Sequence, residues 1–296
     1  MRVASHLAAA LALLTFAGFA QTAQPKPELL LFHPSGPLLA YEVAIIKPVD
    51  PNTADRMVRL PPGATLSPLS IRRYIMNAYG AMYSAQIIGG PDWLNKDAYD
   101  IKGKVPDDLE AAFQNMKVDD RNDQTRSMQQ SLLADRFHLK AHFETRVLPV
   151  YEFVPAKGGL KITEVPAPPE RKPGDPPIAF HPGDPLRPGI MMTMLTNTGL
   201  RTTRARATTM KGLSRLMSDQ LGDTGNRPIV DHTGFSGYFD ITDLTWAPLG
   251  DASAASTSDA PSLTVALEEK LGIKLVPAKD PIEVLVIDSI DRPSPN

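Results

Sequence analysis

Asp231, His232 and Ser236 supply the three residue types of a nucleophilic Ser-His-Asp triad within one short segment. A triad is defined by its geometry, and residues 234–237 lack the Gly-x-Ser-x-Gly spacing of a nucleophile elbow. We favour a tight turn in which Asp231 bonds the backbone and Phe235 packs into the core. The sequence therefore predicts no catalytic residue, and Asp231 and His232 are kept as candidate ligand-binding residues.

Two further histidines raise the question of a metal site. His138 and His142 lie on one face of an expected strand, more than about 10 Å apart at a rise of roughly 3.3 Å per residue. One ion could not bind both directly, because metal–nitrogen bonds are short. There is no cysteine, and we find no Gly-rich phosphate loop, EF-hand or dinucleotide fingerprint. We therefore expect neither a metal centre nor a cofactor.

Aromatic side chains offer a second kind of site. Tyr79 and Trp93 have the residue types that line small-molecule grooves, although we favour core packing for them. With Asp231 and His232 they complete the candidate ligand-binding set.

The elements that must position these residues follow one plan in both halves of the chain. The motif Tyr99-Asp100-Ile101 in the first half corresponds to Phe239-Asp240-Ile241 in the second. A helical pattern precedes each motif, at 70–80 and at 211–222. Each half then reads β-α-β-β-α-β-β. This predicts an α+β fold of two tandem, pseudo-repeated units with helices packed on mixed or antiparallel sheets. We favour two layers side by side, with one sheet built by both halves as the alternative.

The last two strands of each unit are expected to form hairpins. In the first unit, residues 137–143 alternate apolar and polar side chains, and residues 147–154 pair back with them. In the second unit, residues 273–276 pair with 282–287. Both predictions place a turn in the middle of an apolar stretch.

Composition divides the chain further. Arg2, an apolar run over 7–19 and a small residue at Ala20 are typical of a secretory signal peptide, and no other segment is long and apolar enough to cross a bilayer. We expect a signal peptide (1–20), a flexible leader (21–40), a first unit (41–163), a Pro-rich linker (164–189) and a second unit (190–296) with a low-complexity insert (247–261). These features predict a secreted or periplasmic protein.

The charge balance limits the partners. The formal net charge is -2, and removing the signal peptide with Arg2 gives -3, which argues against nucleic acid as a main partner. A local cluster of cations is the exception: Arg201, Arg204, Arg206, Lys211 and Arg215. We interpret it as a solvated face, with an anion-binding patch as the alternative. A protein or a small molecule is the expected partner.

Several motifs resemble those of the soil-associated acidobacterial secreted proteins of unknown function. They are 41–48 (YEVAIIKP), 88–94 (IGGPDWL), 99–101 (YDI), 132–139 (LLADRFHL), 150–151 with 156–159 (AKGG), 230–238 (VDHTGFSGY) and 284–288 (VLVID). The resemblance covers residues 38–293 and implies no established activity. In that family the domain also occurs fused to BlaR/MecR-type membrane metallopeptidases, whose His-Glu-x-x-His motif this chain lacks.

These observations favour a non-catalytic binding or protein-interaction module. One alternative is a hydrolase with a site between the two halves, formed by Asp231, His232 and acids from the other unit. Another, implied by the resemblance to the peptidase-fused proteins, is an extracytoplasmic sensor or an envelope-assembly partner.

Overall fold

The structure is a computed structural model that describes residues 27–50, 52, 68–170, 186–220, 227–247 and 260–293. Helices account for about 29% and strands for about 38%, in mixed and antiparallel sheets, which confirms the predicted α+β class. The predicted signal peptide, much of the linker and most of the insert lie outside the described residues. Within the described part, no helix is both long and apolar enough to cross a membrane.

The first lobe is formed by the elements that precede the long strand β5. They are β1 (Val43–Val49), β2 (Leu69–Ser70), α1 (Ile71–Ala78), the short turn η2 (Ser84–Gln86), β3 (Ile87–Gly89), α2 (Trp93–Lys96), β4 (Ala98–Lys104), α3 (Asp107–Asn115) and α4 (Val118–Arg136). Strand β4 pairs antiparallel with β1 and β2, and α1 packs against α4. Ser70 begins α1, because its hydroxyl accepts a hydrogen bond from the Arg73 N–H.

The second lobe contains β6 (Glu164–Val165), β7 (Ile190–Leu195), β8 (Arg201–Thr208), α5 (Met210–Gln220), β9 (Ile229–Asp231), β10 (Tyr238–Trp246), α7 (Leu263–Ala266) and the π-helical turn η3 (Leu267–Leu271). Its antiparallel sheet has the order β6-β10-β8-β7. Gly272 ends the last helical turn in the left-handed conformation at φ +66°, which a glycine adopts without strain.

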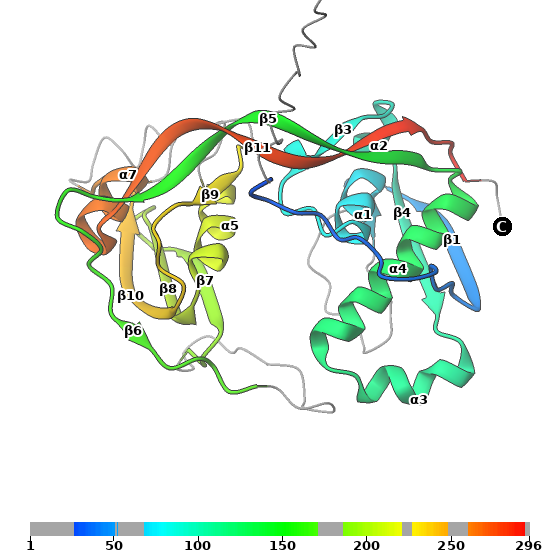
Figure 1. The fold of residues 1–296 in the computed structure, drawn as a ribbon, viewed down its shortest axis with the longest axis horizontal. Helices are drawn as coiled ribbons and strands as arrows, with labels where there is room; N and C mark the ends of the chain where they lie inside the picture. Colours follow the sequence, from blue (N-terminus) through cyan, green and yellow to red (C-terminus); the bar gives the residue numbers. More distant parts are fainter. Residues whose placement is uncertain are drawn as a thin grey trace, which may run out of the picture.

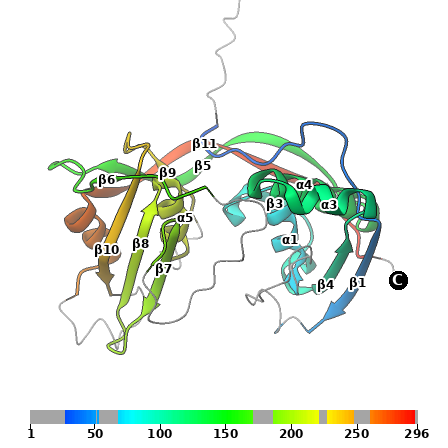
Figure 2. The ribbon, with the colours of Figure 1, turned by 90° about the horizontal axis from the view of Figure 1, so that it is seen from below.

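Two long strands, β5 (Lys140–Pro155) and β11 (Ile273–Ser289), join the lobes. They pair antiparallel over almost their whole length and form a ribbon from which both lobes hang (Figure 1). Seen from below, one lobe lies at each end of this ribbon (Figure 2). The predicted hairpins are therefore wrong, since each expected pair of strands is one continuous strand that passes from one lobe to the other.

Proline positions explain how these strands remain continuous. Pro149, Pro277 and Pro281 lie in the middle of the ribbon: Pro277 and Pro281 fall at the predicted turn of the second unit, and Pro149 falls within a predicted strand of the first. The Tyr151 N–H donates outward to the Pro228 carbonyl at 2.8 Å, so in the Tyr151–Pro277 pair the N–H groups point away from the partner strand. Pro149 is two residues from Tyr151, and Pro281 is four residues from Pro277. Both therefore lie in pairs of the same kind, in which the N–H position points away from the partner strand. None of the three prolines therefore removes a hydrogen bond between β5 and β11.

The ribbon also builds the third sheet, in the order β3-β11-β5-β9. β11 pairs in parallel with β3 of the first lobe, and β5 pairs in parallel with β9 of the second. Leu285 and Ile287 of β11 join the core of the first lobe, whereas Ile273 and Phe153 lie in the core of the second. The two halves thus share one sheet while each lobe keeps its own. The internal duplication and the unit boundaries stay predictions.

Part of the predicted leader packs on the ribbon. The Glu28 N–H donates to the Pro281 carbonyl at 2.9 Å, and the Glu283 N–H donates to the Leu29 carbonyl at 3.2 Å. The side chain of Glu283 accepts from the Leu31 N–H at 2.6 Å, and Leu31 is buried. Residues 28–31 therefore lie along β11, on the outward edge that the prolines leave open.

Candidate functional site

His232 lies directly after β9, where the ribbon passes from one lobe to the other. Its N–H donates to the Phe153 carbonyl at 2.9 Å, which fixes its backbone beside β5. The ring Nδ1 is 3.6 Å from Glu152 Oε1, and Nε2 is 4.0 Å from Glu28 Oε2. The imidazole therefore lies between two carboxylates, one on β5 and one on the segment that precedes β1.

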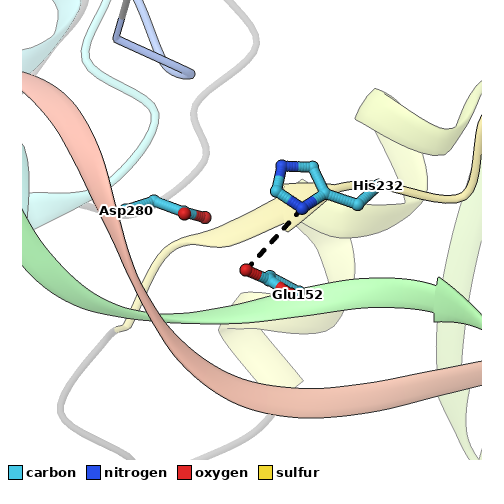
Figure 3. Close-up of side chains that lie close together, drawn as sticks. All are labelled: Glu152, His232 and Asp280. Carbon is cyan, nitrogen blue, oxygen red and sulfur yellow. Dashed lines mark ion pairs between the residues drawn. The ribbon is translucent and has the colours of Figure 1, made fainter. Parts of the chain in front are cut away.

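A third carboxylate reaches the same place from β11. One ligand atom each of Glu152, His232 and Asp280 lies within 4.8 Å of the others, and Figure 3 shows the two acids facing the space beside the imidazole. Asp280 is only 8% exposed, and its buried Oδ2 has no hydrogen-bond partner within the described part of the chain. We call these three residues the junction cluster. A buried carboxylate oxygen without a partner is energetically costly and calls for an explanation.

Asp231 points into a turn instead. Its Oδ1 accepts hydrogen bonds from the Thr233 N–H at 2.9 Å and from the Thr233 hydroxyl at 2.6 Å. The same hydroxyl accepts from the Phe235 N–H at 3.2 Å, and the Phe235 ring meets that of Phe239 edge-on at 5.7 Å between centroids. This is the turn that the sequence pattern favoured, with the acid bonding the backbone and the aromatic ring packed against the core.

Tyr79 and Trp93 lie in the first lobe and do not join His232. The Tyr79 ring packs edge-on against Phe143 at 5.9 Å, and burial raises the pKa of its phenol. Trp93 lies beneath the guanidinium of Arg292, 5.1 Å from the ring centroid. Arg292 in turn donates to Asp97 at 2.7 Å. Of the four predicted ligand-binding residues, the structure places His232 in the junction cluster and the other three elsewhere.

A cleft between the lobes has a volume of about 720 Å³. The first lobe contributes α1, α4 and the segment near Phe32, and the second contributes the beginning of α5. Three cationic side chains line it, Arg126, Lys211 and Arg215, and none of the described lining residues is an Asp or a Glu. This volume falls in the usual range for small-molecule sites, roughly 300–1,000 Å³.

Two of these cations belong to the first two turns of α5. Thr209 begins the helix, because its hydroxyl accepts a hydrogen bond from the Gly212 N–H at 3.1 Å. Lys211 and Arg215 are exposed and four residues apart, and neither forms an ion pair among the described residues. Arg126 differs, because it is paired with Asp123 at 2.8 Å and lies over the Phe32 ring. The free positive charge of the cleft therefore sits on α5.

Sequence analysis missed Glu152 and Asp280. Glu152 lies within an apolar strand, and Asp280 falls in the Pro-rich stretch that was taken for a hairpin turn, where an acid is ordinary. Their proximity to His232 depends on β5, β11 and β9 lying in one sheet, which requires knowing that the strands are continuous. Of the cations that line the cleft, Lys211 and Arg215 belong to the cluster that the sequence analysis interprets as a solvated face, with an anion-binding patch as the alternative, whereas Arg126 was not identified.

The fold and these two sites describe a two-lobed α+β protein with a cationic cleft and a polar junction. A domain family described as "Protein of unknown function (DUF3738)" matches residues 72–290, which is most of the chain, and the chain belongs to this family. The match spans both lobes and the ribbon. Neither a curated protein nor a solved structure shows significant similarity to the chain.

Proposed function

We propose that this chain is a secreted or periplasmic, non-catalytic binding protein that takes a small anionic solute in the cleft between its lobes. The observation that carries the proposal is the pair of unpaired cations, Lys211 and Arg215, on a helix that lines a cleft with no described acid. A carboxylate or phosphate group is the ligand chemistry that such a wall recognises. Export is supported by the signal-like composition of residues 1–20.

The position of these cations is unfavourable without a ligand. Lys211 lies in the first turn of α5, where a positive side chain opposes the helix dipole at a cost of about 0.3–1 kcal/mol. Like charges at i and i+4 add a few tenths of a kcal/mol, roughly 0.2–0.5. An anion in the cleft would offset both terms and would also accept hydrogen bonds from the polar lining. Binding therefore explains why Lys211 and Arg215 occupy these two positions.

Binding of defined small anions tests this proposal. Phosphate, sulfate, citrate and malonate are titrated into the purified protein at low ionic strength, with glucose and glycerol as neutral probes of similar size. We expect at least one anion to bind, and the Lys211→Ala/Arg215→Ala double variant to bind it at least tenfold more weakly. Arg204→Ala is the matched control, because Arg204 is exposed on β8 and does not line the cleft. Equal binding by the double variant would contradict the proposal.

A sensing role is compatible with solute binding. The chain resembles secreted acidobacterial proteins whose domain is also joined to BlaR/MecR-type membrane peptidases. In such a fusion, a solute bound outside the cytoplasm would be the input signal. For this chain, the same cleft would then serve either to bind a solute or to report its presence to a partner protein.

A further inference from the structure

We propose that the junction cluster binds one divalent transition-metal ion, with Glu152, His232 and Asp280 as its protein ligands. These residues do not line the cleft, so the ion and the anionic solute would occupy separate sites. The ion would lie where β5, β9 and β11 meet. It would connect the second lobe to the ribbon that both lobes share.

The buried carboxylate of Asp280 is the first argument. Asp280 is 8% exposed, its Oδ2 is buried without a hydrogen-bond partner, and it forms no ion pair among the described residues. Acids this deeply buried are normally paired with a cation or coordinate a metal. The carboxylate faces His232 and Glu152 (Figure 3). A cation between the three side chains would give the unpaired oxygen its partner.

The distances fit an ion after small side-chain movements. Ligand atoms around a tetrahedral zinc ion lie about 3.4 Å apart, given metal–ligand bonds of about 2.0–2.2 Å. Here Nδ1 of His232 is 3.6 Å from Glu152 Oε1, and the three ligand atoms are all within 4.8 Å of one another. The closure needed is at most about 1.4 Å, the difference between 4.8 and 3.4 Å, and can come from side-chain rotation. The backbones are already fixed, because the three strands belong to one sheet.

The ring of His232 is oriented so that one nitrogen faces the cluster and the other faces a further carboxylate, that of Glu28. Nδ1 faces the cluster, while Nε2 is 4.0 Å from Glu28 Oε2 on the leader. A metal-bound histidine usually donates its other ring N–H to a carboxylate, which fixes its tautomer. Glu28 is placed to accept that hydrogen bond after a small side-chain movement, because the Glu28 backbone N–H is hydrogen-bonded to the Pro281 carbonyl of β11. Glu28 is thus expected to be a positioning residue rather than a direct ligand.

The donor set selects the class of ion. One imidazole nitrogen with two carboxylates suits Zn²⁺ and its neighbours Mn²⁺, Co²⁺ and Ni²⁺, whereas Mg²⁺ and Ca²⁺ prefer oxygen ligands alone. The chain has no cysteine, so softer thiolate sites are excluded. Zn²⁺ is the probe that best represents this class.

His142 provides an internal contrast. Its Nδ1 is 3.0 Å from an Asp288 oxygen and its Nε2 is 3.0 Å from Glu144 Oε1, so each ring nitrogen already has its own carboxylate partner. This arrangement raises the pKa of the imidazole, chiefly through the hydrogen bond to Asp288 and then that to Glu144. Both ring nitrogens are therefore engaged by carboxylates, and neither is free for an ion. His142 is therefore an acid-flanked histidine that should not bind metal.

Zinc titration of the chelator-treated, purified protein tests the proposal. We expect one ion per chain with a Kd of roughly micromolar or lower. Zinc at about 100 times Kd should raise the melting temperature by roughly 5–10 °C. Asp280→Asn and His232→Gln should each weaken binding at least tenfold, and Glu28→Gln should weaken it by about tenfold as a second-shell change. His142→Gln should leave the Kd unchanged.

Three results would overturn the proposal. The first is the absence of one-to-one binding by Zn²⁺, Mn²⁺, Co²⁺ and Ni²⁺. The second is tighter binding of Ca²⁺ or Mg²⁺ than of Zn²⁺, because it would assign the site to another class of ion. The third is binding that persists in His232→Gln or is lost in His142→Gln. Because His232 and Glu28 are partly exposed, their variants test the site independently of the buried Asp280, and circular dichroism verifies that every variant keeps the fold.

Discussion

Replacing Asp280 by Asn should stabilise the metal-free protein. The substitution keeps the side-chain volume and removes a charge that is 8% exposed and has an oxygen without a partner. An unsatisfied buried polar group costs about 1–3 kcal/mol, and a charged one costs more. We therefore expect the free energy of unfolding to rise by about 1–2 kcal/mol, since the neutral amide still lacks a partner. In a protein of this size, that corresponds to roughly 2–8 °C in melting temperature.

Guanidinium unfolding in the presence of a chelator, followed by circular dichroism, measures this change. The slope of unfolding free energy against denaturant should be the same for both proteins, so that the midpoints compare stability alone. Asp135→Asn is the control, because Asp135 is exposed on α4 and should change stability by no more than about 0.5 kcal/mol. A lower stability of Asp280→Asn without metal would refute the reasoning, because it would mean that the carboxylate has a stabilising partner. With zinc present, the order of the two proteins should reverse.

Three further outcomes follow from the structure and are measured by unfolding or by NMR. Gly272→Ala should cost at least about 3 kcal/mol, because a Cβ there would meet the backbone of residues 159–161 in addition to the strain at φ +66°. Gly234→Ala, at φ +72° in open space, should cost only about 1 kcal/mol, and equal losses would contradict the close approach. Phe153→Ala should cost about 3–5 kcal/mol, because this side chain is 0% exposed in the second core; a loss below 2 would be incompatible with that packing. The raised pKa of His142 should fall when Asp288 becomes Asn. Because the folded-state pKa is the higher one, this pair stabilises the fold below the ordinary pKa of about 6.5 and ceases to do so as the pH rises through the raised value. An unchanged NMR titration would show that the hydrogen bond to Asp288 is absent.

The sequence predicted local structure well and long-range pairing poorly. The predicted helical segment 70–80 begins at Ser70, whose hydroxyl accepts a backbone hydrogen bond from Arg73 at the start of α1. The hairpins failed because prolines and charges in the middle of an apolar stretch usually indicate a turn. Here Pro277 and Pro281 occupy positions whose N–H would point away from the partner strand. That property depends on the register of β5 and β11, and no local pattern reveals it.

The candidate sites show the same limit. His232 was identified by residue type, and the structure adds the two acids that face it. Glu152 and Asp280 are more than 120 positions apart in the chain and come together only through the register of the ribbon. Lys211 and Arg215 were visible as a charged cluster, yet a solvated face and a ligand-binding wall have the same sequence. A ligand-binding wall differs from a solvated face in having an opposite wall, and here α1 and α4 of the first lobe form it.

The most direct measurement of the proposed function is native mass spectrometry of the protein purified from the cells, or the culture medium of the cells, that naturally produce it. Wild-type protein should carry a small anionic molecule, identifiable after release, and the Lys211→Ala/Arg215→Ala double variant prepared in parallel should lack it. Arg204→Ala should retain it. Wild-type and double-variant proteins that carry the same molecule, or no small molecule at all, would contradict the account of the cleft as a binding site for an anionic solute.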